Sequence, residues 1–198
     1  MKVGKWVAAV LGIVAAFAAA SAAAQDSKGL YVGGSFGLSQ FSDSCDGVTV
    51  RCDDEDAGFR VFGGYQFNRW AAVEVGAAHM GKLLFEGTVP GVGAVNQETE
   101  VYGFDVTGVV FWPVLDWMAL FGKLGAYRMR AASDLVIAGV PQSAPGKTSS
   151  GFTYGLGAEF RVGGLGIRAE FQRYDNVGGV PVGEDSVLFY SAGVLWRF

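Results

Sequence analysis

The stretch "LGIRAEFQRYD", which runs from Leu165 to Asp175, decides the fold. Alternate positions in it form one apolar set and one polar set: Leu165, Ile167, Ala169 and Phe171 against Arg168, Glu170 and Gln172. An alternation with a period of two predicts a β-strand that has one apolar face and one polar face. The apolar face would point inward in a water-soluble protein, whereas in a membrane barrel it would point into lipid.

The start of the chain has the three parts of a secretory signal peptide. In "MKVGKWVAAVLGIVAAFAAASAAAQDS" two lysines precede an uncharged apolar run from Trp6 to Ala20, and small residues follow up to Ala24. We therefore expect residues 1–24 to be cleaved and residues 25–198 to form the mature protein. A retained membrane helix is disfavoured, because the run is short and Ala-rich and no positively charged stop follows it.

Charge and hydropathy then narrow the class of protein. Without its first two lysines the chain has thirteen basic and nineteen acidic residues, a formal charge of −6. No basic patch is available for a nucleic acid, so we expect no such partner. Beyond the signal no apolar run is long enough for a membrane helix, so any bilayer crossing must use strands.

Eight segments with a period of two follow the signal, with no linker or change of composition between them. Their number is even, and each has roughly the length that a tilted strand needs to cross a bilayer. They are residues 30–41, 58–67, 71–80, 100–112, 117–129, 151–162, 165–174 and 186–198. We therefore predict a single all-β domain, an eight-stranded antiparallel up-and-down transmembrane β-barrel.

The connections between these segments alternate between short and long. The connections "NRW", "PVLD" and "GG" are short, whereas residues 42–57, 81–99, 130–150 and 175–185 are long and rich in Gly, Pro, Ser and Asp. Short periplasmic turns and long extracellular loops are typical of outer-membrane barrels. Trp70, Trp112 and Trp117 lie at the short turns, where an aromatic girdle is expected.

The alternation predicts which side chains enter the barrel. Bulky apolar residues such as Phe59 and Ile167 should face lipid, and the polar and very small residues should face the interior. The inward charges form two sets of four: Arg60, Lys123, Arg161 and Arg168 against Glu74, Asp105, Glu159 and Glu170. A balanced interior favours a plugged barrel over a charge-selective pore. Counting back from the turns places Glu159 opposite Arg168 and Asp105 opposite Lys123.

The mature chain resembles the eight-stranded OmpA-like outer-membrane barrel family, which includes the OmpX/Ail and opacity-type surface proteins. The segments "GFRVFGGYQFNRWAAVEVG", "GLGAEFRVGGLGIRAEFQRYDNV" and "YSAGVLWRF" carry the resemblance. By it, Phe198 with Trp196 and Tyr190 is similar to the C-terminal signal for barrel assembly. Long OmpA proteins continue into a peptidoglycan-binding domain, whereas this sequence stops at Phe198, so the resemblance does not imply a tether to the cell wall.

The resemblance implies a non-enzymatic protein of the bacterial outer membrane that displays surface loops. Envelope integrity, scaffolding and adhesion remain open as its role. We expect contacts with outer-membrane lipid, lipopolysaccharide and the barrel-assembly machinery, and an extracellular ligand could bind the loops. A narrow passive pore is the alternative. A lipid-modifying enzyme is disfavoured because the single histidine, His79, lies on the lipid or rim side and no H-x-S arrangement like that of lipid A deacylases follows it.

Two further features concern the first long loop. Cys45 and Cys52 are close in sequence in an exported chain, which favours a local disulfide over a metal site. The acids of residues 53–56 do not have the spacing of an EF-hand, so a solvated charge run is the preferred interpretation over calcium binding. We expect no cofactor and no metal.

Overall fold

The computed structural model describes residues 28–41, 51–53, 55–89, 93–137, 140–143, 146–177 and 186–198. The predicted signal peptide, residues 1–24, lies outside these described residues, as does Cys45. Within the described ranges, no helix has the length and apolar character that a membrane crossing requires.

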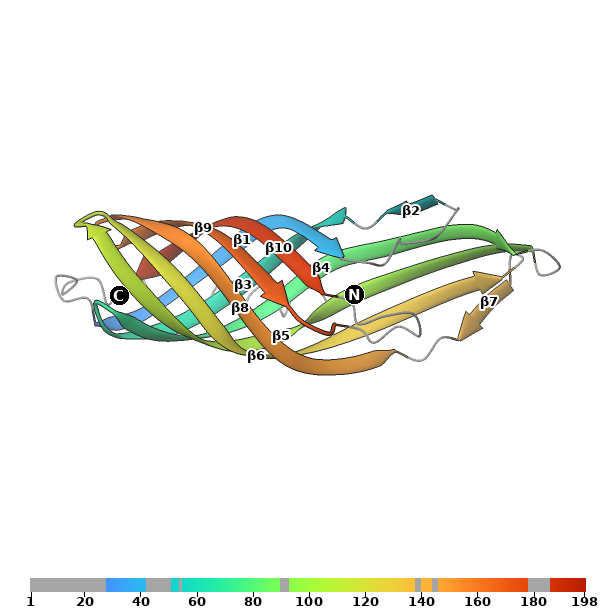
Figure 1. Ribbon diagram of the computed structural model, residues 1–198, viewed down its shortest axis with the longest axis horizontal. Coiled ribbons are helices and arrows are strands. Elements are labelled where there is room, and N and C mark those ends of the chain that lie inside the picture. Colours follow the sequence, from blue (N-terminus) through green and yellow to red (C-terminus); the bar gives the residue numbers. More distant parts are fainter. Residues whose placement is uncertain are drawn as a thin grey trace, which may run out of the picture.

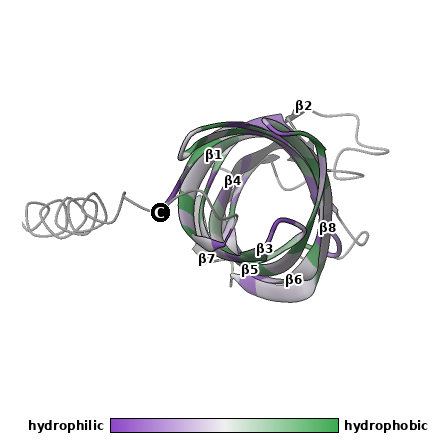
Figure 2. Cartoon of the chain, turned by 90° about the vertical axis from the view of Figure 1, so that its left-hand side faces the viewer, coloured by the Kyte–Doolittle hydropathy of each residue, from purple (hydrophilic) through white to green (hydrophobic). Residues whose placement is uncertain are grey.

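The described elements are β-strands, and eight of them close into a barrel. The strands are β1 (Gly29–Phe41), β2 (Arg51–Asp53), β3 (Glu55–Asn68), β4 (Ala71–Val89), β5 (Gly93–Leu115), β6 (Met118–Ile137), β7 (Val140–Ser143), β8 (Lys147–Val162), β9 (Leu165–Tyr174) and β10 (Val187–Arg197). Antiparallel pairing runs in the order β4-β3-β1-β10-β9-β8-β6-β5, and β5 also pairs with β4. The strands therefore form a complete ring when seen end-on (Figure 2), and the predicted eight-stranded barrel is confirmed.

Tight turns join the strands at one end of the barrel. The turn residues are Arg69–Trp70, Asp116–Trp117 and Gly163–Gly164. Asn68 organises the first turn, because its Oδ1 accepts hydrogen bonds from the backbone N–H groups of Trp70 (2.8 Å) and Ala71 (3.0 Å). Gly163 has a φ of 59°, a left-handed conformation that glycine adopts without strain and that two-residue hairpin turns require.

At the opposite end, three strands run far beyond the others (Figure 1). Residues 81–99 and 130–150, predicted as loops, are largely strand, so that prediction was wrong. Glycine and proline suggested loops there, but ladder pairing continues from Lys82 opposite Glu100 to Val89 opposite Gly93 and uses the backbone groups. With β2 paired to β4 and β7 to β6, these parts form a five-stranded sheet, β2-β4-β5-β6-β7. We call residues 51–53, 82–89, 93–100, 130–137 and 140–143 the strand extension.

The outer wall of the barrel is an apolar belt. On β5 the large apolar side chains that point outward, from Trp112 to Tyr102, are 40% to 72% exposed. Eleven residues of a tilted strand cover about 25 Å along the barrel axis, the height of a lipid-facing band. On β9, Ile167 is 50% exposed and Arg168 is 2% exposed. The apolar face of the stretch from Leu165 to Asp175 therefore points outward, and its charges point inward.

The interior holds more bulky apolar residues than the alternation predicted. One buried cluster lies toward the long strands: Phe41, Ala78, Met80, Val101, Tyr127, Met129, Ala131, Tyr174, Val177, Val187 and Phe189. A second lies toward the tight turns: Tyr31, Phe62, Ala72, Val109, Phe111, Ala119, Phe121 and Leu195. The prediction that bulky apolar side chains face only lipid was wrong, because an eight-stranded barrel is wide enough to be filled by side chains. The charged residues lie between these two clusters along the strands.

Candidate functional site: the charged interior of the barrel

The eight candidate interior charges all lie on inward positions of the barrel strands. Arg60 is on β3, Glu74 on β4, Asp105 on β5, Lys123 on β6, Glu159 and Arg161 on β8, and Arg168 and Glu170 on β9. Arg161 has a side chain that is 20% exposed, and the others are at most 6% exposed. Removing a charge from water costs several kcal/mol, so each buried charge needs partners.

Glu74 joins three cations at the centre of the barrel. Its carboxylate lies 2.6 Å from Nη1 of Arg168, 2.8 Å from Nζ of Lys123 and 3.7 Å from Nη1 of Arg60. The hydroxyl of Tyr31 also donates to it, at 2.8 Å. Because β4 and β9 are not neighbours in the sheet, the contact with Arg168 crosses the lumen.

Arg168 combines two carboxylates with two aromatic rings. Its Nη2 donates to Oε2 of Glu159 at 2.9 Å, and the two residues face each other across the β8–β9 hairpin. The guanidinium carbon lies 4.6 Å from the ring centroid of Phe121 and 5.0 Å from that of Phe62. These distances are in the range of favourable cation–π contacts, so the apolar cluster near the turns also supports the charges.

Asp105 does not face Lys123, so this predicted pairing was wrong. Asp105 lies opposite Tyr127 and binds Arg60 through Nη2 (2.6 Å) and Nε (3.0 Å), while Lys123 binds both oxygens of Glu170 at 2.8 Å. The predicted pairing was counted back from the turn between β5 and β6, on the assumption that the chain reverses near Pro113. That proline instead stays in the ladder opposite Ala119, next to a bulge, and the chain reverses two residues later. Proline is tolerated at such irregular strand positions.

Three interior residues were missed by the sequence analysis. Arg197 on β10 binds Oε1 of Glu159 at 2.5 Å, beside Arg161 at 2.6 Å. The hydroxyl of Tyr174 donates to Asp105 at 3.2 Å, and Tyr31 donates to Glu74. The period-two alternation of their strands places all three side chains inward, so the sequence pattern could have identified them. With Arg197 the network has five cations and four carboxylates, so the predicted balance of four against four was wrong.

The network fills the middle of the barrel and cross-links its wall. Each of its four carboxylates contacts at least one cation, so none is free to act as a general base. Among the described residues, no group of three or more His, Cys, Asp and Glu side chains could hold a metal ion. The arrangement supports a rigid, plugged interior rather than chemistry on a substrate.

The other candidate residues lie outside this network. Tyr190 and Trp196 point outward from β10, 50% and 44% exposed, and the N–H of Phe198 donates to the carbonyl oxygen of Leu30 at 3.0 Å. His79 also points outward, stacks on Phe59 and lies 2.6 Å from Oε1 of Glu100. The role of the three C-terminal aromatics in assembly stays a prediction.

The first long loop lies mostly outside the described residues. The backbone of Cys52 pairs with Phe85 in the β2–β4 ladder, but Cys45 is not described, so the disulfide stays a prediction. Of the acids at residues 53–56, Asp56 accepts hydrogen bonds from the backbone N–H groups of Lys82 and Ala57, both at 2.7 Å. Asp56 therefore links the first residues of β3 to β4 at Lys82.

Comparison with known families matches residues 25–198 to a model described as the OmpA-like transmembrane domain. The chain is 26% identical over 198 residues to outer membrane protein A of Salmonella typhi, covering 96% of this chain and 54% of the relative. It is 29% identical over 182 residues to outer membrane protein A of Klebsiella pneumoniae, covering 85% and 50%. The chain thus spans about half the length of these relatives.

Solved structures share the fold at low sequence identity. Ail, the attachment invasion locus protein of Yersinia pestis, gives a TM-score of 0.57 at 18% identity, covering 86% of this chain and 99% of Ail. Neisserial surface protein A gives 0.57 at 16% identity, covering 85% and 97%. OprG from Pseudomonas aeruginosa gives 0.52 at 13% identity, covering 87% and 97%.

Proposed function

Because the chain belongs to the family of OmpA-like transmembrane domains, we propose that it is a closed membrane scaffold whose function lies in the strand extension that it presents outside the cell. The protein is a β-barrel of the bacterial outer membrane, and OmpA-like barrels are generally non-enzymatic. Envelope integrity and adhesion are both roles of this kind, and both depend on what the barrel displays rather than on what it conducts.

The filled interior is the observation that carries this proposal. The contact of Arg168 on β9 with Glu74 on β4 spans the lumen between two apolar clusters, and that of Arg60 on β3 with Asp105 on β5 crosses the inner face of β4. Water or ions passing through would have to break buried ion pairs and displace packed aromatic rings, which is costly in a low-dielectric interior. A passive pore is therefore the weaker alternative.

The strand extension offers a rigid surface for contacts. Its central strands β4, β5 and β6 continue without interruption from the barrel wall, so the sheet is held by the barrel at its base. Functional contacts are often carried by segments that a rigid scaffold positions. Ail has been solved in complex with the heparin analogue sucrose octasulfate, so one barrel of this fold binds a sulfated sugar. That example supports an extracellular ligand here as well.

Two measurements test the proposal. In planar bilayers the refolded protein should give no steady ohmic current, with a general porin in the same membrane as the control for sensitivity. A steady current at low voltage would contradict the closed scaffold. Conduction would favour the pore.

The second measurement removes the display surface but keeps the barrel. Replacing residues 84–98 by Asn-Gly joins β4 to β5 in register, because Leu83 already pairs with Thr99. Cells displaying this variant should adhere to monolayers of epithelial cells less than cells displaying the full protein at equal surface level. Equal adhesion of the two would refute a contact role for this part of the extension.

A further inference from the structure

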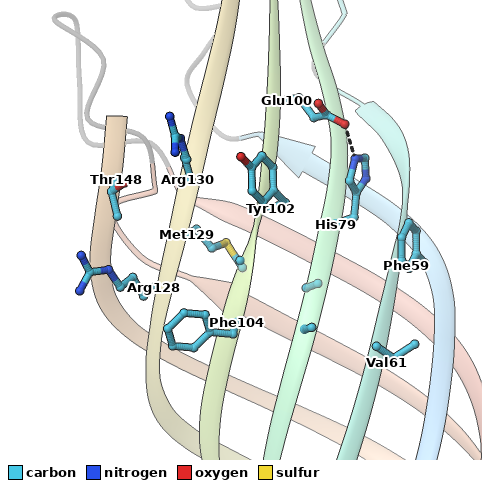
Figure 3. Close-up of a pocket in the computed structure, with 13 residues that line it drawn as sticks. Phe59, Val61, His79, Glu100, Tyr102, Phe104, Arg128, Met129, Arg130 and Thr148 are labelled. Carbon is cyan, nitrogen blue, oxygen red and sulfur yellow. Dashed lines mark hydrogen bonds and ion pairs between the residues drawn. The ribbon is translucent and has the colours of Figure 1, made fainter. Parts of the chain in front are cut away.

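A groove of about 880 Å³ lies on the outer wall of the barrel, where the apolar belt ends and the strand extension begins. Phe59, Val61 and Phe104 line its apolar part, and at the upper edge of the belt it is lined by Tyr102, Arg128 and Arg130 together with His79 and Glu100. Figure 3 shows Arg130 and Tyr102 in the upper part of the view, with Phe104 and Val61 below them. The groove is therefore apolar toward the membrane and cationic toward the outside.

The two arginines are the first outward-pointing cations at the upper edge of the belt on β6. Below them the outward residues Ala126 and Leu124 are apolar, with Leu124 66% exposed. Arg128 lies between Phe104 on β5 and Ser150 on β8, and Arg130 lies between Tyr102 and Thr148. Both guanidinium groups are thus flanked by aromatic and hydroxyl side chains rather than by carboxylates.

The two carboxylates on this face whose side chains the structure describes, Glu98 and Glu100, already have partners on the far side of the groove. Glu100 lies 2.6 Å from Nε2 of His79, and Glu98 lies 2.5 Å from Nζ of Lys82. The hydrogen bond from His79 lowers the pKa of Glu100, which lies beyond the belt. Among the described side chains, neither Arg128 nor Arg130 forms an ion pair.

Two unpaired arginines at this height fit a phosphate. Guanidinium groups bind phosphate oxygens in bidentate geometry, and basic residues at a membrane surface attract anionic headgroups. The apolar part of the same groove can take an acyl chain, because it continues into the belt. We propose that Arg128 and Arg130 bind the phosphate of an acylated phospholipid or glycolipid of the outer leaflet, with one acyl chain along Phe104 and Val61.

The test compares lipid binding by the full protein and two charge-matched variants in detergent micelles, measured by native mass spectrometry. The variant R128Q/R130Q removes the proposed site. The control K82Q/R173Q removes the same amount of charge at the same rim, from cations that are already paired with Glu98 and Asp175. The probes are diphosphoryl lipid A, its dephosphorylated form and inorganic phosphate. Heat-modifiable migration in gels verifies that each variant is folded.

We expect the full protein and the control to bind diphosphoryl lipid A at least tenfold more tightly than the dephosphorylated lipid, and R128Q/R130Q to lose that preference. Inorganic phosphate at millimolar concentration should not displace the lipid. Equal loss in the control variant, retention by R128Q/R130Q, or displacement by inorganic phosphate would each overturn the proposal. A further variant, A77W, fills the apolar part of the groove and should weaken lipid binding while the arginines remain.

Discussion

Glu159 and Arg168 face each other across the Gly163–Gly164 hairpin, with 2.9 Å between Oε2 and Nη2. Both side chains are at most 2% exposed. Arg168→Ala should lower the free energy of unfolding by about 3–5 kcal/mol, because it removes a buried cation that Glu159 and Glu74 share in a confined interior. The double variant Glu159→Leu with Arg168→Met should cost less than the sum of the two single changes. Folding titrations into lipid vesicles measure the three variants.

The exposed pair Lys82 and Glu98 is the matched control for this cycle. Its atoms approach to 2.5 Å, but the side chains are 48% and 43% exposed. Solvent screens such pairs, so their coupling should stay within about 1 kcal/mol. If the coupling between Glu159 and Arg168 is no larger than this, the two charges are not buried in a network that excludes water.

The depth of a charge on the lipid face gives a second prediction. Ile167 lies close to the Gly163–Gly164 turn on β9, whereas Phe171 lies four residues further along the strand, against the ring of Tyr190. Phe171→Arg should cost about 2–4 kcal/mol, and Ile167→Arg should cost less, because the penalty falls from the bilayer midplane to the interface. Vesicle titrations of both variants measure this difference. Neutral results for both would mean that these faces do not meet lipid.

The sequence was sufficient to predict the eight-stranded barrel and to predict which charged side chains point into it. Strand parity depends only on the period of two, so Arg60, Lys123 and Glu159 could be assigned to the interior without knowing which strands meet. The hairpin contact of Glu159 with Arg168 was also accessible, because a two-residue Gly-Gly turn sets the register.

Contacts across the lumen could not be predicted in the same way. The meeting of Glu74 with Arg168 depends on the tilt and stagger of all eight strands, which no local pattern encodes. The partner of Asp105 was misassigned because the turn between β5 and β6 was expected near Pro113, whereas the chain reverses two residues later. The strand extension was missed for a related reason: glycine and proline indicate breaks locally, whereas pairing with a neighbouring strand can carry the chain past them.

A third prediction concerns Cys45 and Cys52. We expect them to form a disulfide that orders the first loop and leaves the barrel unaffected, because the closed loop is short and the barrel's backbone hydrogen bonds do not depend on it. Reductant should leave the thermal unfolding of the barrel nearly unchanged. Labelling of free thiols in the exported, unreduced protein would rule the bond out, and the Cys45→Ser/Cys52→Ser variant gives the background of the labelling.

The last prediction treats Phe198 as an assembly signal. Its N–H donates to the carbonyl oxygen of Leu30 at 3.0 Å, and the residue lies directly after the last residue of β10. On packing alone, deletion of Phe198 should therefore be mild, and refolding into lipid vesicles without other proteins should be close to that of the full protein. As a signal, its deletion should sharply lower the amount of heat-modifiable barrel in outer-membrane fractions, and Phe198→Tyr should restore much of it. Trp117→Ala is the matched control, because it removes another aromatic side chain at the same end of the barrel, where Trp117 stacks on Phe160. If the Phe198 deletion lowers outer-membrane levels no more than Trp117→Ala does, Phe198 contributes only to packing at the membrane interface.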